Sequence, residues 1–190
     1  QYNIDAFIVD EAYLLERDLT LPQIGIGELP SEKSTVFLGF TFENKKGPNF
    51  LESTAKRLIN LGLELPGFDF SERPEQSENG IGTQIFQNSY IDFGCSLGRL
   101  VQVRSGVFIG HDTVIGDLTY IAPGVKLGSY VEVQEKCFLG FGCMVAPNSK
   151  IGHNSIIGTG SMVKGNIPPY SVVTADKPEG RVVPDPFRLL

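Results

Sequence analysis

The sequence predicts a mainly β protein in which a coil of short parallel strands follows a small α/β domain. Three observations predict this fold class. Residues 85–168 repeat with a period of six, residues 1–68 show a strand–strand–helix–strand pattern, and the stretch between them is polar and turn-rich. The expected boundaries are therefore 1–68 for the α/β domain, 69–84 for a linker or excursion, 85–168 for the coil, and 169–190 for a C-terminal tail.

Composition and charge narrow the classes of function. Hydrophobic residues make up 41% of the 190 residues and charged residues 20%, which is typical of a soluble globular protein. A net charge of −6 argues against nucleic acid and anionic membranes as partners, because both bind basic surfaces. No run approaches the roughly 18 apolar residues of a membrane span, and no signal peptide is visible. Three cysteines without a CxxC motif favour reduced thiols and a cytoplasmic location.

The first segment has the pattern of a small domain of mononucleotide-binding type. "DAFIVD" and "STVFLGF" are typical of buried strands, and "NFLESTAKRLINLGLEL" predicts an amphipathic helix over about residues 48–60 followed by a short strand. The glycine-rich turn that opens such domains is not in this segment, so it either precedes Gln1 or is lacking.

The repeat begins at Ile85 and runs for fourteen blocks. Its blocks are IFQNSY, IDFGCS, LGRLVQ, VRSGVF, IGHDTV, IGDLTY, IAPGVK, LGSYVE, VQEKCF, LGFGCM, VAPNSK, IGHNSI, IGTGSM and VKGNIP. The first residue of every block is Ile, Leu or Val, and the fifth is Ser, Cys, Val, Thr or, once, Ile. We expect both positions to face the interior. The third and fourth positions then form a corner, where Gly, Asn and Asp tolerate unusual backbone angles.

The cysteines follow the same pattern. Cys95, Cys137 and Cys143 all occupy the fifth position of a block. We therefore expect them to be small buried core residues and not catalytic thiols.

The chemistry is expected at His111, the third residue of the block IGHDTV and thus a corner residue. With three blocks per coil, its neighbours one coil away are Phe93 and Ser129. Histidine suits general-base catalysis because its ordinary pKa lies near the working pH. A carboxylate beside it, from Asp112 or from Asp117, would hold the ring in one tautomer and stabilise the imidazolium.

The repeat, together with "IGHDTVIGDLTYIAPG" after a small α/β domain, resembles the hexapeptide-repeat sugar acyltransferases. It is most similar to the UDP-4-amino-sugar N-acetyltransferases and the sialic acid O-acetyltransferases. The resemblance implies a left-handed parallel β-helix preceded by a Rossmann-like, nucleotide-sugar-binding domain. It also implies a homotrimer with acetyl-CoA between neighbouring β-helices, and His111 as general base with Asp112 orienting it. Since "FIVDE" stands where the family contacts the nucleotide, Asp10 and Glu11 become substrate-binding candidates.

The resemblance also suggests which residues meet acetyl-CoA. Backbone N–H groups at Gly128 and Ser129 would hold the thioester carbonyl, and Lys164 would meet a phosphate. Two later corners would line the pantetheine and adenine, formed by Phe141, Gly142, Thr159 and Gly160. The sequence departs from the family in two places. Tyr120 stands where many relatives carry a second histidine that contacts the cofactor, and "TADKPEG" replaces the usual "GNPAK"-like ending.

The second histidine, His153, occupies the same place in its block but lies two and a third coils from His111. It is therefore expected on a different corner, as a surface residue. Two histidines on different corners argue against the γ-type carbonic anhydrases, which share the fold but need three histidine ligands for zinc. No metal is expected.

The leading prediction is transfer of an acetyl group from acetyl-CoA to an amino group of a nucleotide-linked amino sugar. The amine would attack the thioester directly, without an acyl-enzyme intermediate. Two alternatives stay open. The same histidine could activate a sugar hydroxyl for O-acetylation, or the β-helix could be a catalytically silent assembly scaffold. The His111–Asp112 corner argues against the scaffold.

Overall fold

The computed structural model describes residues 7–9, 23–25, 47–60, 62, 64–65, 67–69 and 78–189. The chain divides into two compact units, Gln1–Ser34 and Thr35–Leu190. In the first unit, β1 (Phe7–Val9) pairs in parallel with β2 (Gln23–Gly25), which confirms a strand within "DAFIVD". The expected strand at "STVFLGF", and with it most of the Rossmann-like pattern, lies outside the described residues.

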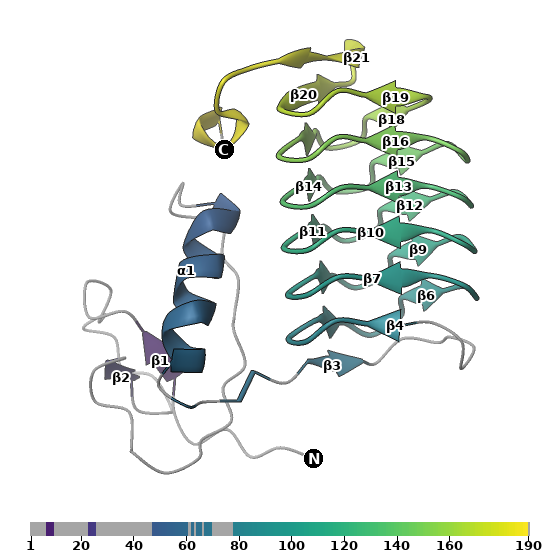
Figure 1. The fold of residues 1–190 in the computed structure, drawn as a ribbon. Helices are drawn as coiled ribbons and strands as arrows, with labels where there is room; N and C mark the ends of the chain where they lie inside the picture. Colours follow the sequence, from purple (N-terminus) through teal and green to yellow (C-terminus); the bar gives the residue numbers. More distant parts are fainter. Residues whose placement is uncertain are drawn as a thin grey trace. The chain divides into compact units, whose positions relative to one another are not determined.

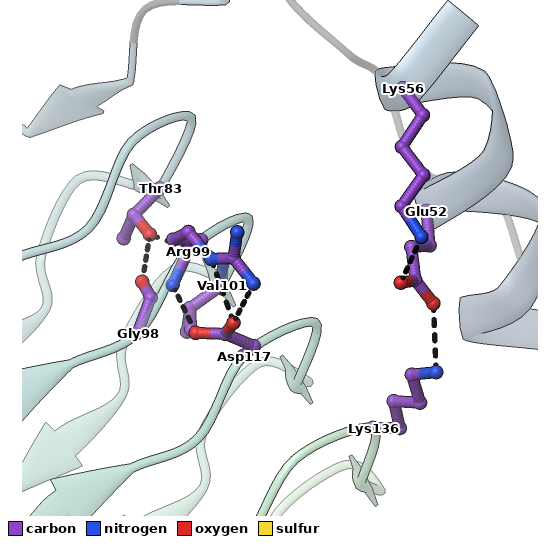
Figure 2. A network of polar contacts seen from close by, with 8 residues as sticks. All are labelled: Glu52, Lys56, Thr83, Gly98, Arg99, Val101, Asp117 and Lys136. Atoms are coloured by element: carbon purple, nitrogen blue, oxygen red, sulfur yellow. Dashed lines mark hydrogen bonds and ion pairs between the residues drawn. The ribbon is translucent and has the colours of Figure 1, made fainter.

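The amphipathic helix is confirmed as α1, Gly47–Asn60. Its Ala55 and Leu58 are buried, as the helical spacing of the apolar residues requires. Glu52 Oε2 on the same helix accepts a hydrogen bond from Lys136 Nζ at 2.8 Å, and Glu52 Oε1 accepts one from Lys56 Nζ at 2.8 Å (Figure 2). In the part of the chain that the structure describes, no helix is long and apolar enough to span a membrane.

The repeat forms a parallel β-solenoid whose coils stack along one axis (Figure 1). Each coil contributes one two-residue strand to each of three faces. The six-stranded face consists of β4 (Glu78–Asn79), β7 (Ser96–Leu97), β10 (Val114–Ile115), β13 (Glu132–Val133), β16 (Lys150–Ile151) and β19 (Asn166–Ile167). The five-stranded face consists of β6 (Tyr90–Ile91), β9 (Phe108–Ile109), β12 (Lys126–Leu127), β15 (Met144–Val145) and β18 (Met162–Val163).

The eight-stranded face includes the strands at both ends of the solenoid. It consists of β3 (Phe68–Asp69), β5 (Gln84–Ile85), β8 (Gln102–Val103), β11 (Tyr120–Ile121), β14 (Phe138–Leu139), β17 (Ile156–Ile157), β20 (Ser171–Thr174) and β21 (Lys177–Val182). All pairs within the three faces are parallel except β20–β21, which is antiparallel. A 3-10 helix at Pro186–Leu189 follows.

The interior positions are those expected from the repeat. In each two-residue strand of the solenoid core the second residue faces inward, and it is the first residue of a block. Every first-position residue from Ile85 to Val163 is at most 3% exposed, and so is every fifth-position residue from Ser89 to Ile167. Each buried aliphatic side chain contributes roughly 1.5–3 kcal/mol relative to exposure. The coil is therefore stabilised by a continuous apolar column.

Most small polar residues at the fifth position are hydrogen-bonded to the next coil, whereas the buried Ser161 Oγ has no partner among the described residues. Thr113 Oγ1 donates to the carbonyl of Gly128 at 3.0 Å and accepts from the N–H of Val131 at 3.3 Å. The thiols of Cys95 and Cys137 donate in the same way to carbonyls one coil on, at 3.2 and 3.3 Å. The expected burial of all three cysteines is confirmed.

The fourth position of the blocks adopts a left-handed backbone conformation, with φ near +60°. Gly, Asn and Asp at this position were expected, since they tolerate this conformation. Larger side chains also adopt it: Leu100, Leu118, Tyr130 and Lys136 have φ between 56° and 60°. Hydrogen bonds between successive coils hold these turns, for example from the Tyr130 N–H to the His111 carbonyl at 3.0 Å.

The solenoid extends beyond both ends of the repeat. On the N-terminal side β3 pairs with β5 and β4 with β7, so strand pairing begins before Ile85. On the C-terminal side the last coil is two residues shorter: Lys150 pairs with Asn166, whereas Met144 pairs with Met162. The expected block VKGNIP is thus cut short. Ile167 takes the next interior place, and β20 continues the eight-stranded face within the expected tail.

Candidate active site

His111 and Asp112 form the turn between β9 and β10, at the corner where the five-stranded face meets the six-stranded face. We call this stack of turns the His111 corner; it consists of Phe93–Gly94, His111–Asp112, Ser129–Tyr130, Pro147–Asn148 and Lys164–Gly165. Asp112 occupies the left-handed fourth position with φ 56°. Its N–H donates to the carbonyl of Phe93 at 3.0 Å, which fixes the turn against the preceding coil.

The two side chains of this turn form a hydrogen-bonded pair. Nδ1 of His111 lies 2.9 Å from Oδ2 of Asp112, and the two side chains are 32% and 39% exposed. A carboxylate can only accept, so Nδ1 carries a proton, and in the neutral imidazole Nε2 carries a lone pair. Within residues 78–189 no hydrogen bond engages Nε2. The arrangement is that of a histidine prepared to accept a proton from a ligand.

Aromatic rings flank the imidazole on both neighbouring coils. The Phe93 ring stacks on the His111 ring with centroids 5.2 Å apart and an interplanar angle of 5°. The Tyr130 ring meets it edge-on from the next coil, at 5.0 Å and 83°. Phe93 is the neighbour expected from the spacing of the repeat. The contact with Tyr130 was not expected, since the spacing indicated Ser129.

Asp117, the alternative partner for His111, is excluded by the structure. Its carboxylate accepts two hydrogen bonds from the Arg99 side chain at 2.6 and 2.8 Å, and one from the Arg99 N–H at 2.8 Å (Figure 2). Arg99 and Asp117 belong to a second corner, between the six-stranded and eight-stranded faces. Of the two acids considered from the sequence, Asp112 alone contacts the histidine.

His153 lies on this second corner, as expected from its offset of two and a third coils. Its surroundings share the edge-on tyrosine of His111 but differ in the other side chains around the ring. Tyr170 meets its ring edge-on at 5.0 Å, but the neighbouring side chain is the amide of Asn154, with Nδ2 2.9 Å from His153 Nδ1. An amide N–H donates, so here Nδ1 accepts and Nε2 carries the proton. The two histidines thus hold opposite tautomers.

Gly128 and Ser129 were expected to hold the thioester carbonyl through their N–H groups. The N–H of Gly128 already has a backbone acceptor, and that of Ser129 has none among the described residues. The Gly128 N–H already donates to the carbonyl of Val145 at 2.9 Å within the strand ladder, so it is not available as an oxyanion donor. A Cβ at Gly128 would lie 2.6 Å from Pro147 N, so close packing of the coils explains this glycine. No carbonyl among the described residues accepts from the Ser129 N–H, one coil beyond His111.

The remaining cofactor candidates lie on both corners of the five-stranded face. Lys164 is exposed and belongs to the His111 corner, three coils beyond the histidine. Phe141, Gly142, Thr159 and Gly160 share the corner between the eight-stranded and five-stranded faces, which we call the Phe141 corner. Phe141 is 55% exposed, and open space surrounds the positions that a Cβ would take at Gly142 and Gly160. An extended ligand can therefore approach this backbone closely.

The five-stranded face between these corners carries an apolar row that the sequence reasoning missed. Its outward residues pair in register from coil to coil: Tyr90, Phe108, Lys126, Met144 and Met162. The four apolar members are 39–58% exposed, and Tyr90 stacks on Phe108 at 5.5 Å. In the sequence, these five residues occupy the sixth position of every third block, so the row could have been found from the repeat. Lys126 separates two exposed apolar pairs, Tyr90–Phe108 and Met144–Met162, and exposed apolar patches of this kind are typical of an interaction surface.

Other features of the described residues do not add a second candidate site. A groove of about 530 Å³ lies between α1 and the second corner. Two cations line it, and each forms an ion pair with a carboxylate of the same groove: Arg99 with Asp117, and Lys136 with Glu52. No group of three or more His, Cys, Asp or Glu side chains within the described ranges is arranged to hold a metal ion. The expected substrate-binding residues, Asp10 and Glu11, lie outside the described residues.

Comparison with known proteins supports the repeat and the fold. A family model for the bacterial transferase hexapeptide (six repeats) matches residues 130–165. A comparison with curated protein sequences found no match. The predicted hexapeptide repeat is thus confirmed over these residues, and the fold is shared with the solved structures described next.

Three solved structures share the fold. WeeI from Acinetobacter baumannii AYE is 20% identical with a TM-score of 0.82, over 94% of this chain and 85% of that one. The acetyltransferase domain of PglB from Neisseria gonorrhoeae FA1090, in complex with acetyl coenzyme A, is 19% identical with a TM-score of 0.77, over 94% and 85%. PerB from Caulobacter crescentus, in complex with CoA and GDP-perosamine, is 22% identical with a TM-score of 0.76, over 87% and 80%.

Proposed function

We propose that this protein is an acetyltransferase that moves an acetyl group from acetyl-CoA to the amino group of a nucleotide-linked amino sugar. The observation that carries the proposal is the His111–Asp112 pair, in which a carboxylate 2.9 Å from Nδ1 leaves Nε2 as a base at an exposed corner. The fold shared with the CoA-bound and acetyl-CoA-bound structures supports it, as does the GDP-perosamine bound in one of them.

His111 is the general base in this proposal. Nε2 accepts the proton that the sugar's amino group loses as its nitrogen bonds to the acyl carbon. The carbon–sulfur bond then breaks, and the imidazolium returns the proton to the departing sulfur. Asp112 stabilises the imidazolium between these events, because its carboxylate faces Nδ1–H. Proton transfer of this kind typically contributes a factor of 10²–10⁴ to the rate.

The Ser129 N–H is the candidate oxyanion donor. It belongs to the turn directly beyond His111, and the strand ladder does not engage it. A backbone N–H directed at the oxygen of the tetrahedral intermediate is typically worth about 2.7–4 kcal/mol. Direct attack needs only this donor, the base, and both substrates held together in the correct geometry.

The residues expected to bind acetyl-CoA fit a homotrimer better than a monomer. Lys164 and Ser129 lie on one corner of the five-stranded face, and Phe141 and Thr159 on the other. If the apolar row faces a threefold axis, the His111 corner of one protomer lies beside the Phe141 corner of its neighbour. The exposed glycines of the Phe141 corner then admit the pantetheine arm, and Lys164 supplies a cation for a phosphate.

The N-terminal segment completes the proposal. We assign residues 1–68 to binding of the nucleotide-linked sugar, with Asp10 and Glu11 as contacts, and we place the enzyme in the cytoplasm, where nucleotide-linked sugars are the expected acceptors. O-acetylation is the second candidate, because the same Nε2 can accept the proton of a hydroxyl.

The test is release of free CoA thiol from acetyl-CoA in the presence of UDP-, GDP- and dTDP-linked amino sugars and free sialic acid. His111→Ala is expected to lose at least 10²-fold in turnover, whereas His153→Ala, the matched histidine on another corner, retains it. Release of CoA thiol with sialic acid alone would show that the second candidate, O-acetylation, is the correct function. Near-normal turnover of His111→Ala, or no binding of acetyl-CoA by the wild type, would overturn it in favour of another base or a scaffold.

A further inference from the structure

We propose that Phe93 and Gly94, the turn one coil before His111, position the catalytic pair: Gly94 leaves space for the Asp112 carboxylate, and Phe93 sets the plane of the imidazole. The inference deepens the proposed function and rests on it. Neither residue reaches the reacting atoms, so both are positioning residues.

Gly94 lies directly beneath the Asp112 side chain. A Cβ at this position would lie 2.5 Å from Oδ1 of Asp112 and 3.3 Å from its Cγ. The Asp112 backbone is unable to yield, because its N–H is bonded to the Phe93 carbonyl at 3.0 Å. Any side chain at 94 therefore displaces the carboxylate, and with it the acceptor that holds the proton on His111 Nδ1.

The backbone conformation does not by itself require glycine at this position. Gly94 has φ 67°, but Lys136 holds the equivalent place beneath Asn154 with φ 58°. Asn154 is bonded to the coil below through the same N–H to carbonyl contact, to Glu135 at 3.0 Å. A long side chain is thus tolerated below an Asn–His pair. Glycine occurs below the Asp–His pair, where a Cβ would meet the carboxylate.

Phe93 fixes the ring of His111 from below. The two rings are nearly parallel, at 5° and 5.2 Å, and Tyr130 meets the imidazole from the other side. Partial rotation of the imidazole about its Cβ–Cγ bond would break the stack, so Phe93 fixes the plane of the ring. Within that plane, the Asp112 carboxylate selects the orientation in which Nδ1 faces it. At the second corner the equivalent of Phe93 is Glu135, so the fold does not require an aromatic residue here.

The charged and titratable groups around the pair are few. Asp112 contributes the carboxylate in the same turn, Tyr130 a phenol from the turn above, and Asp92 a carboxylate below. One oxygen of Asp92 accepts from the Phe93 N–H at 2.8 Å. Phe93 offers its π face to the imidazolium that forms during turnover, an arrangement that favours the cation. Its removal is therefore expected to act on kcat.

The first experiment compares Gly94→Ala with Gly106→Ala. Gly106 also holds a left-handed fourth position, with φ 73°, but a Cβ there would meet nothing closer than 4.0 Å. Both variants carry the same backbone strain, so their difference isolates the contact with Asp112. We expect the two variants to lower the thermal midpoint of unfolding by a similar amount. Gly94→Ala is also expected to lower kcat at least tenfold with little change in KM for the acceptor, and to mix the tautomers of His111, which Gly106→Ala should leave unchanged.

A double-mutant cycle tests whether the effect passes through the carboxylate. In an Asp112→Ala background, Gly94→Ala is expected to have little further effect on kcat, because its target is gone. Full additivity of the two substitutions would overturn the role of Gly94. If Gly94→Ala fails to fold, Phe93→Leu, which adds no backbone strain, tests the same turn.

Phe93→Leu is expected to lower kcat about five- to tenfold, and Phe93→Tyr, which keeps the stack, to restore it. The ¹⁵N chemical shifts of the neutral imidazoles give a spectroscopic readout. His111 of the wild type is expected to show the Nδ1-protonated tautomer, with His153 as an internal reference in the Nε2-protonated form. Gly94→Ala is expected to mix the tautomers of His111 alone.

The outcomes separate this inference from the proposed function. If His111→Ala is inactive while Gly94→Ala and Phe93→Leu keep the wild-type kcat and the wild-type tautomer, the positioning role is wrong and the general base stands. If His111→Ala is fully active, the proposed function itself fails.

Discussion

The Asp112 carboxylate lies 2.9 Å from Nδ1 of His111, within a single turn of the solenoid. The equivalent turn at His153 places an amide, Asn154, at the same distance from Nδ1. The two turns share position in the block, left-handed backbone and an edge-on tyrosine from the next coil. The side-chain atom that faces Nδ1, an oxygen at one turn and a nitrogen at the other, sets the tautomer, and only the tautomer at His111 fits the proposed general base.

Asp112→Asn is expected to reproduce the His153 arrangement at the active site. The amide will donate to Nδ1, the proton will move to Nε2, and the base will be lost. We expect kcat to fall about 10²–10⁴-fold, in line with a wrong-tautomer change in a histidine–carboxylate pair. Acetyl-CoA turnover at constant pH measures this, together with the thermal midpoint of unfolding, which should change little.

The matched control for this substitution is Asn154→Asp. It creates the same pair on the second corner, where no acyl acceptor is expected. Activity should stay within twofold of the wild type. An active Asp112→Asn enzyme would show that the carboxylate does not determine the protonation state of His111.

Met144→Glu tests the apolar row on the five-stranded face. If the proposed homotrimer packs through this face, a charge at the centre of the interface costs several kcal/mol, and the assembly should dissociate. Turnover should fall with it if the Phe141 corner of one protomer completes the site of the next. Size-exclusion chromatography with light scattering measures the assembly.

Val114→Glu is the matched control for that substitution. Val114 is the outward residue of β10 on the six-stranded face and is 48% exposed, compared with 39% for Met144. It should leave the assembly intact. A wild type that is monomeric, or a trimer indifferent to Met144→Glu and sensitive to Val114→Glu, would assign the interface to a different face.

Glu52 contributes a pH-dependent tether between α1 and the solenoid. Its hydrogen bond to Lys136, assisted by Lys56, lowers the pKa of its carboxyl from the ordinary value to about 2. A lowered folded-state pKa stabilises the folded protein above the unfolded-state pKa, and this stability is lost as the pH falls from about 4.5 towards 2. Glu52→Gln should therefore lower the free energy of unfolding at neutral pH.

The expected loss is about 0.2–1 kcal/mol, because the pair is partly exposed and screened by solvent. Chemical denaturation at pH 7 and pH 3 measures the difference, which should shrink at the lower pH. Glu64→Gln serves as control, since Glu64 is exposed and forms no ion pair with the described residues. A constant difference at both pH values would contradict the tether.

The three thiols should be unreactive in the folded protein. Burial raises the pKa of Cys137 and of Cys143 to about 12, and that of Cys95 above its ordinary value. Since the thiolate is the reactive form, a thiol reagent at pH 8 should titrate none of them without denaturant and all three with it. A fast-reacting thiol in the native protein would show that the coil opens near that cysteine.

Much of the solenoid was predictable because a period of six leaves few alternatives for the backbone. Every block has a branched aliphatic residue at its first position and, with one exception, a small residue at its fifth. Both positions can be buried only if each block forms one side of a coil. The same reasoning placed His111 on a corner, Phe93 next to it, and His153 on another corner. The helix over 47–60 followed from its apolar spacing.

The contacts that distinguish one corner residue from another depended on the stacking of coils. Periodicity indicated Ser129 as the neighbour of His111, but the ring that reaches it belongs to Tyr130. In the sequence, Asp117 lies five residues beyond Asp112 and was considered as the partner of His111. The structure places it on the second corner, where it accepts hydrogen bonds from Arg99. The Gly128 N–H was predicted to donate to the thioester carbonyl, but in the structure it donates to the Val145 carbonyl within the strand ladder.

The sequence by itself determined the repeat, its interior, and the presence of a histidine–acid pair on one turn, because side-chain burial follows directly from position within a block. Only the tertiary structure decided the tautomer of each histidine, the use of each N–H, the early end of the last coil at Lys164–Gly165, and the alignment of Tyr90, Phe108, Met144 and Met162 into one row. These depend on what lies one coil above and below, and residues eighteen apart in sequence meet only when the coils stack.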